Sequence, residues 1–394
     1  MPRFVFAFLA CVLLPSLLAA AGQYHALRDG LKNFPAAVHA QQQGRVAFLG
    51  GSITQMPGWR DGVTEDLKAR FPQAALDFVQ AGVASMGSTP GAFRLERDVF
   101  ARGPVDLLFV EAAVNDSTNL CPPQQMIRGM EGIARHARLL NPKIDIVFMY
   151  FADPEKLAAY NEGTTPEVIL QHERVAEFYA LPSLNLALEV TERIRAGEFS
   201  WEGDFKDLHP SPFGHELYRR SIARLLDAAW NSPPGTAAPY MLPAKPLDNF
   251  SYTHPAIVPI GNAIPVAGFR FVDQWQPTDG KGTRPGFTDV PMLVAESPGA
   301  SLTFAFEGIA AGIWVAAGPD AGAVAWQIDG APEQTLDLFT PWSAGLHLPW
   351  SYVLADELPP GPHALSLRIL PEKNRESSGT AVRIAHFLVN RPAM

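Results

Sequence analysis

Short apolar runs alternate with amphipathic stretches between residues 45 and 230. The apolar runs are continuous, which is typical of strands buried on both faces of a parallel sheet. Several of the amphipathic stretches open with proline, which the first turn of a helix accepts. The predicted strands span residues 46–49, 76–79, 105–110, 144–149 and 183–187, and the predicted helices span residues 59–70, 92–100, 123–140, 166–179 and 212–229. This order predicts a three-layer, doubly wound α/β domain.

The pattern changes after residue 230. A proline- and glycine-rich segment at 231–236, with more prolines at 239, 243 and 246, indicates a linker. Beyond it, apolar residues recur at every second position, as in 302–306 and 365–369, and turn sequences separate the runs. Such short, alternating strands are typical of a β-sandwich. We therefore predict an α/β domain over residues 22–232, a linker over 233–249 and an all-β sandwich or jelly roll over 250–394.

The N-terminus resembles an export signal. Residues 1–21 combine a short basic start, an apolar stretch and small residues at a cleavage position. A retained membrane anchor is the alternative, but the apolar stretch is shorter than the roughly 20 residues of a spanning helix and Pro15 interrupts it. Cleavage would leave Cys121 as the only cysteine, which excludes an intramolecular disulfide. We expect a secreted or periplasmic bacterial protein with no membrane association after cleavage.

Composition and charge narrow the classes of partner. The chain is 47% hydrophobic and 18% charged, as is ordinary for a globular protein. Its formal net charge of −9 would repel a phosphate backbone, so nucleic-acid binding is not expected. No spacing of histidine, cysteine and carboxylate residues fits a metal site, and no glycine-rich phosphate loop follows a strand. Neither a metal nor another cofactor is predicted.

Three polar residues are predicted to meet at one rim of the sheet. Ser52 follows the first strand, Asn115 follows the third strand, and His209 precedes the last helix. The carboxyl ends of parallel strands form the rim where α/β proteins bind ligands. A serine can act as a nucleophile, a histidine as its base, and an asparagine amide as a donor to an oxyanion. Each residue alone has an ordinary role, as a helix cap, a structural histidine or a turn residue, but together they favour a hydrolase.

Four sequence blocks resemble those of the SGNH, or GDSL, hydrolase superfamily. They are Gly50-Gly51-Ser52-Ile53-Thr54, the nine residues 80–88, Val114-Asn115-Asp116 and Asp207-Leu208-His209-Pro210. The resemblance covers residues 44–230 and implies a flavodoxin-like sheet. It implies that Ser52 is the nucleophile and His209 the general base. It also implies an oxyanion hole made by the Ser52 amide, the Asn115 side chain and an amide of the second block, with an acyl-enzyme that water resolves.

Two departures from the family pattern concern the supporting groups. The oxyanion amide of the second block aligns with Ser85 rather than Gly82, and a backbone N–H serves whatever the side chain. The family's acid stands three residues before the histidine, where this chain has Lys206. Asp207 is the predicted acid, because residues i and i+2 of an extended segment share one side. The alternative is that a backbone carbonyl orients His209.

An exported SGNH hydrolase joined to a β-sandwich resembles carbohydrate acetylesterases. The leading hypothesis is therefore a secreted serine esterase that removes O-acetyl groups from a carbohydrate or polysaccharide. The alternatives are a lipase, lysophospholipase or thioesterase on the same site, or a non-catalytic glycan-binding protein. The sandwich contains five tryptophans that could stack on sugar rings or fill its core. They are Trp275, Trp314, Trp326, Trp342 and Trp350.

Overall fold

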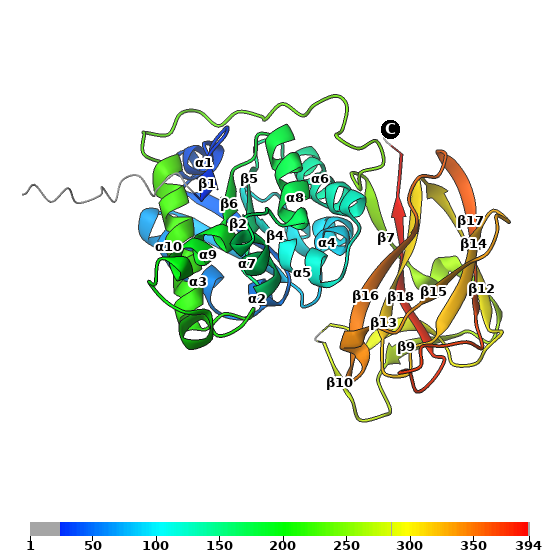
Figure 1. Ribbon diagram of the computed structural model, residues 1–394. Coiled ribbons are helices and arrows are strands. Elements are labelled where there is room, and N and C mark those ends of the chain that lie inside the picture. Colours follow the sequence, from blue (N-terminus) through cyan, green and yellow to red (C-terminus); the bar gives the residue numbers. More distant parts are fainter. Residues whose placement is uncertain (1–23, 285, 393–394) are drawn as a thin grey trace, which may run out of the picture.

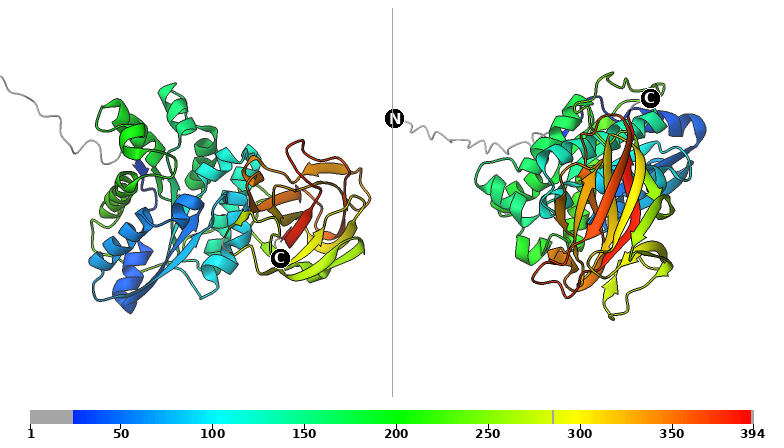
Figure 2. Two further views of the ribbon diagram at one scale, coloured as in Figure 1. Left: turned by 90° about the horizontal axis from the view of Figure 1, so that it is seen from below. Right: turned by 90° about the vertical axis from the view of Figure 1, so that its right-hand side faces the viewer.

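The computed structural model describes residues 24–284 and 286–392, which form two domains that lie side by side (Figures 1 and 2). An α/β domain comes first and a β-sandwich follows it along the chain. The predicted signal peptide, residues 1–21, lies outside the described residues. Within the two described ranges, no helix is long and apolar enough to cross a membrane.

The central sheet of the α/β domain has six strands in the order β1-β6-β5-β4-β2-β3. Their bounds are β1 (His25–Ala26), β2 (Gln43–Gly50), β3 (Ala75–Gly82), β4 (Leu107–Glu111), β5 (Asp145–Tyr150) and β6 (Ser183–Asn185). Strands β2 to β6 are parallel, and their order is that of a flavodoxin-like sheet, so the predicted fold class is confirmed. The two-residue strand β1 was not predicted and pairs antiparallel with β6.

Helices cover both faces of this sheet (Figure 1). Their bounds are α1 (Asn33–Gln41), α2 (Ser52–Gln55), α3 (Trp59–Arg70), α4 (Ser88–Leu95), α5 (Ala113–Thr118), α6 (Pro123–Leu140), α7 (Pro154–Asn161), α8 (Glu167–Phe178), α9 (Leu186–Arg195) and α10 (Pro212–Ala229). Helices α3 and α10 pack together, as do α4, α6 and α8. Three predicted helices, α3, α6 and α10, have the predicted bounds.

Two sequence predictions needed correction at element ends. The strand predicted over 183–187 stops at Asn185, because the Asn185 side chain accepts a hydrogen bond from the Leu188 amide at 3.0 Å and caps α9. The helix predicted over 92–100 begins earlier, at Ser88, and its last five residues form the π-helical turn Glu96–Phe100. The continuous apolar pattern was otherwise a sound guide, since every residue of β4 and β5 is buried.

The second domain is a β-sandwich, as predicted. Its strands are β7 (Pro255–Pro259), β8 (Ala263–Ala267), β9 (Arg270–Trp275), β10 (Gly282–Thr283), β11 (Val290–Ala295), β12 (Ser301–Gly308), β13 (Ala310–Ala317), β14 (Ala323–Ile328), β15 (Gln334–Asp337), β16 (Leu346–Ala355), β17 (Gly361–Ile369) and β18 (Val382–Asn390). One sheet has the order β10-β16-β13-β18-β11-β9, with β7 on β18, and the other has the order β15-β14-β17-β12-β8. Leu302 and Phe304 of β12 are buried between the sheets, as their alternation predicted.

The seven-stranded sheet of the sandwich faces the α/β domain. Trp314 of β13 and Leu388 of β18 are fully buried and belong to the hydrophobic core of the α/β domain rather than to that of the sandwich. The Arg97 guanidinium lies 5.5 Å from the centre of the Trp314 ring. Trp314 therefore fills the junction between the domains. Trp275 and Trp326 are also buried, whereas Trp342 is 51% exposed.

The segment from residue 231 to residue 254 joins the domains and contains the predicted linker, 233–249. It runs back across the α/β domain (Figure 1) and is bonded to it along the way. The Tyr240 hydroxyl donates to Asp145 at 2.6 Å, and the Asp248 amide donates to Glu131 at 2.8 Å. Tyr252, near the end of the segment, is fully buried. This segment is an ordered part of the fold.

Candidate active site

Ser52 is the first residue of α2 and comes directly after β2 and two glycines. A Cβ on Gly51 would collide with the amide oxygen of Asn115, and a Cβ on Gly50 would collide with the Thr54 side chain. Glycine is needed at both positions because other chain segments approach the backbone so closely. The pair therefore brings Ser52 and Asn115 together at the carboxyl rim of the sheet, as the topology predicted.

His209 contacts Ser52 although it lies 157 residues later in the chain. Its Nε2 atom lies 2.8 Å from the Ser52 Oγ atom, within hydrogen-bond distance. His209 lies in the short segment between the π-helical turn Trp201–Phe205 and α10. The Ser211 amide fixes this segment by donating to the Phe205 carbonyl at 3.0 Å. A hydroxyl and an imidazole at this distance form the pair that activates a serine nucleophile.

Asp207 lies beside His209, but not in the geometry of a bonded triad. Its Oδ1 atom accepts a hydrogen bond from the His209 backbone amide at 3.0 Å and lies 3.8 Å from His209 Nδ1. The second distance is too long for a hydrogen bond. The next acid upstream, Asp204, accepts instead from the Ser200 amide at 2.8 Å. Asp207 is thus on the predicted side of the ring, and its role as the acid stays a prediction.

Replacing Asp207 by asparagine tests this role. We expect the Asp207→Asn variant to lower kcat by about tenfold, much less than the loss of a buried triad acid, because both side chains are largely exposed and their attraction is screened by water. Steady-state kinetics on an activated ester would measure the change. Glu202→Gln is the control, since it removes another exposed negative charge nearby and should leave kcat unchanged. An equal rate for Asp207→Asn and wild type would mean that His209 acts without this acid.

The three groups predicted to form an oxyanion hole adjoin one another. Asn115 lies in α5, 9% exposed, with its amide oxygen against Gly51. Ser85 lies in the loop after β3, and the carbonyl of its neighbour Met86 also faces Gly51. Within residues 24–284 and 286–392, the Ser85 amide has no acceptor. The Ser52 amide lies at the open first turn of α2. That these two amides and the Asn115 side chain serve one anionic oxygen stays a prediction.

Buried carboxylates hold the segment around Asn115 in place. Glu111 accepts from the Val114 amide at 3.0 Å. Asp116 accepts from the Ser88 amide at 2.8 Å, and its other oxygen lies 2.9 Å from His172 Nε2. Both carboxylates and His172 are buried. These residues order the loops of the site, and His172 has the structural role that a histidine within a helix usually has.

Glu111 also makes stability depend on pH. Burial raises the pKa of the Glu111 carboxyl to about 7, so the folded chain binds this proton more tightly than the unfolded chain does. The free energy of unfolding therefore falls as the pH rises from the ordinary range of a glutamate through 7. Glu111→Gln keeps an acceptor for Val114 and should raise that free energy by up to about 3 kcal/mol at pH 8, and by much less at pH 5. Urea unfolding at both pH values would measure this, and an equal gain at both would contradict it.

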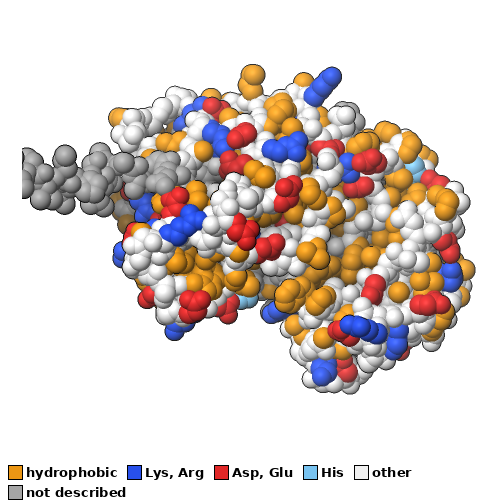
Figure 3. Space-filling view, viewed as in Figure 1, with side chains coloured by type: hydrophobic (Ala, Val, Ile, Leu, Met, Phe, Trp, Pro, Cys, Tyr) orange, Lys and Arg blue, Asp and Glu red, His pale blue; other side chains and the backbone are white. Residues whose placement is uncertain are grey.

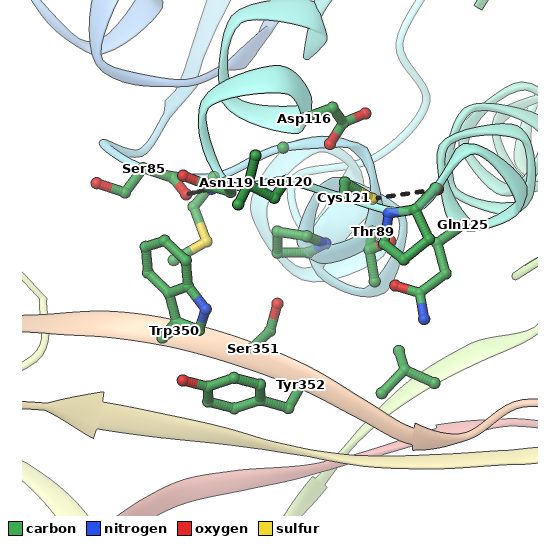
Figure 4. A pocket seen from close by; sticks show the side chains of 15 residues that line it. Ser85, Thr89, Asp116, Asn119, Leu120, Cys121, Gln125, Trp350, Ser351 and Tyr352 are labelled. Carbon is green, nitrogen blue, oxygen red and sulfur yellow. Dashed lines mark hydrogen bonds between the residues drawn. The ribbon is translucent and has the colours of Figure 1, made fainter. Parts of the chain in front are cut away.

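A pocket of about 270 Å³ lies beside Ser85, between the two domains (Figure 4). Ser85, Asn119 and Gln125 line it from the α/β domain, and Trp350 and Ser351 of β16 rise toward them from the sandwich (Figure 4). Figure 3 shows the notch between the domains, with hydrophobic side chains along it. The sequence did not predict that β16 would form a wall of a cavity next to the predicted site.

Two further residues with reactive side chains, His215 and Cys121, have ordinary surroundings. His215 is buried, and its Nδ1 atom accepts from the Trp59 amide at 3.2 Å. Cys121 is half-buried, and burial raises the pKa of its thiol. No cluster of three or more histidine, cysteine, aspartate or glutamate residues in the described part of the chain could hold a metal ion.

Comparison with known proteins gives a match to one family model and similarity to solved structures, among them two of a two-domain esterase. Residues 48–217 match the model of the GDSL-like lipase/acylhydrolase family. A two-domain esterase, CEX, active on acetylated mannans is 21% identical with a TM-score of 0.77, over 95% of this chain and 99% of that one. The structure of CEX co-crystallised with mannopentaose is 21% identical with a TM-score of 0.72, over 91% of this chain and 94% of that one. No curated protein matches significantly.

The two structures show that the whole fold, with both domains in this order, occurs in another protein. The family match covers Ser52, Ser85, Asn115 and His209. Together with the four sequence blocks, this match over most of the α/β domain identifies it as an SGNH-type ester hydrolase domain.

Proposed function

We propose that this protein removes O-acetyl groups from a carbohydrate, through an acetyl-enzyme formed on Ser52. The observation that carries the proposal is the 2.8 Å contact between Ser52 Oγ and His209 Nε2. Ser85, of the predicted oxyanion hole, lines a pocket with walls from both domains. The likeness of the whole fold to an esterase active on acetylated mannans supports the carbohydrate substrate.

The proposed reaction has two halves. Ser52 Oγ attacks the acetyl carbonyl while His209 Nε2 takes the hydroxyl proton. The negative charge that develops on the carbonyl oxygen is stabilised by the amides of Ser52 and Ser85 and by the Asn115 side chain. Collapse of this intermediate releases the sugar hydroxyl, which receives the proton from His209. Water, deprotonated by His209, then attacks the acetyl-enzyme. The bond to Ser52 Oγ breaks, acetate leaves, and Ser52 Oγ takes the proton back from His209.

The lining of the interdomain pocket favours a sugar over a long acyl chain. It includes the polar side chains of Thr89, Gln125 and Ser351 and the indole of Trp350, beside apolar residues such as Met86 and Leu120. Hydroxyl-rich rings bind through such hydrogen-bonding groups and stack on aromatic faces. A long acyl chain would make no use of such hydrogen-bonding groups.

Export is part of the proposal. Residues 1–21 have the composition of a secretory signal, and a polysaccharide substrate would be met outside the cytoplasm. Expression of the full chain in a Gram-negative host, followed by fractionation and intact mass, would test this. Mature protein shortened by about 21 residues in the periplasm or medium supports export, and full-length protein in the membrane fraction supports an anchor.

The substrate assay compares p-nitrophenyl acetate, butyrate and octanoate, with Ser52→Ala as the blank, and then acetate release from acetylated mannan and xylan. We expect acetate esters to be preferred and at least one polysaccharide to be deacetylated. A preference for octanoate would favour the lipase or thioesterase alternative. Absence of hydrolysis, with retained binding to the polysaccharide, would favour a non-catalytic glycan-binding protein.

A further inference from the structure

The loop that carries the proposed oxyanion amide contains a backbone conformation unusual for its residue. The Met86 amide donates to the Val83 carbonyl at 3.2 Å and closes a four-residue turn. Ser85 is the third residue of this turn and has a φ of 67°. A positive φ at this position is characteristic of a type II turn, where glycine is usual. Serine is strained there because of its Cβ, so something must hold the turn.

Side chains from two other elements hold it. The Gln55 side chain, at the end of α2, accepts from the Ala84 amide at 3.0 Å. The Asn119 side chain, just after α5, donates its Nδ2 proton to the Ser85 carbonyl at 2.9 Å. Because the Ala84 amide is fixed, relaxation of Ser85 toward a negative φ would carry its carbonyl away from Asn119. The hydrogen bond from Asn119 therefore opposes that relaxation.

The orientation of the Ser85 amide depends on the same torsion. Turns of types I and II differ by a flip of the peptide between their second and third residues, here Ala84 and Ser85. The Ser85 N–H belongs to this peptide, so the two forms direct it to opposite sides of the turn. Within the described ranges this N–H has no acceptor of its own, which leaves it free for a ligand in the form that the structure shows.

We propose that Asn119 is a positioning residue for the oxyanion hole, which holds Ser85 in its left-handed conformation so that its amide faces the reacting carbonyl. The proposal rests on the function proposed above. It assigns to Asn119 no contact with the reacting atoms. Its effect is exerted through the Ser85 backbone, so its loss should lower kcat more than it changes KM.

A competing role is possible in the same place, since Asn119 also lines the interdomain pocket. If Asn119 acted only by binding the sugar, its loss would leave kcat for p-nitrophenyl acetate, which carries no sugar, unchanged. If it positions Ser85, glycine at residue 85 should compensate, because glycine adopts a positive φ without strain. The double variant Ser85→Gly/Asn119→Ala separates the two roles.

The experiment measures kcat and KM for p-nitrophenyl acetate with four proteins: wild type, Asn119→Ala, Ser85→Gly and the double variant. We expect Asn119→Ala to lower kcat by about 100-fold, as the loss of one oxyanion donor does, with KM changed by less than about threefold. The double variant should recover most of that loss and approach the rate of Ser85→Gly alone.

Asn141→Ala is the matched control. Asn141 also donates from its side chain to a backbone carbonyl, that of Val105 at 2.8 Å, but at the amino end of the strands, away from the site. It should lower Tm without lowering kcat. An unchanged kcat in Asn119→Ala would overturn the proposal, and so would a loss that Ser85→Gly does not correct. If wild type itself is inactive on every ester, the proposed function fails instead, so the two failures are distinguishable.

Discussion

The Ser52→Ala variant is expected to lose ester hydrolysis almost completely while remaining folded. The Oγ atom is the only group within hydrogen-bond distance of His209 Nε2 in the described structure, and alanine offers no nucleophile in its place. Removing the nucleophile of a serine hydrolase costs about 10⁴-fold or more in kcat. The side chain is short and partly exposed at the start of α2, where alanine is well tolerated, so Tm should hardly change.

Kinetics on p-nitrophenyl acetate and a thermal melt would check both statements. Ser117→Ala is a suitable control, because Ser117 is another helical serine near the rim, and its Oγ atom accepts from Lys156 at 3.1 Å. The Ser117→Ala variant should hydrolyse the ester at the wild-type rate. Hydrolysis at the wild-type rate in Ser52→Ala would show that the reaction occurs elsewhere.

The His209→Ala variant should lose activity by about 10³- to 10⁴-fold, because nothing else would take the Ser52 proton. The ring lies in the open, with 47% of the side chain exposed, so free imidazole can enter the space that it leaves. We therefore expect added imidazole to restore part of the rate in His209→Ala and none of it in Ser52→Ala. The double variant should be no slower than either single variant, since the two residues act as one unit.

His215→Gln is the control for this second experiment. His215 belongs to the same part of the chain, but its ring accepts from the Trp59 amide inside the fold. Its replacement should lower Tm and leave kcat within about twofold of wild type. If the His209→Ala variant kept the wild-type kcat without added imidazole, the assignment of His209 as the base would be wrong.

The sequence predicted well those strands and helices whose hydrophobic pattern follows directly from their burial. Strands buried on both faces need continuous apolar residues, so β4 and β5 were evident. Helices α3, α6 and α10 are long and amphipathic. The short helices α7 and α9, by contrast, begin at side-chain caps, Asp153 and Asn185, that resemble ordinary turn residues until their partners are known.

The sequence likewise predicted some residues of the site and missed others. Topology alone places Ser52, Asn115 and His209 at one rim, because each follows or precedes an element that ends there. The role of Asn119 was missed, since its partner, the Ser85 carbonyl, is 34 residues away in the chain. The wall that Trp350 and Ser351 contribute was missed too, because the docking of one domain on another leaves no periodic pattern in either sequence.

The segment between the domains ties the two described domains together, so we expect them to unfold as one cooperative unit. Arg128 of α6 is almost completely buried, and it bonds Asp248 of that segment at 3.0 Å, Asp356 of the sandwich at 2.7 Å, and Glu357. Cutting the chain at residue 232 would leave this arginine without its three carboxylates and would uncover the apolar surface that Tyr252 and Trp314 now fill. The hydrolase half should then aggregate instead of surviving as a minimal enzyme, and the intact chain should melt in a single transition.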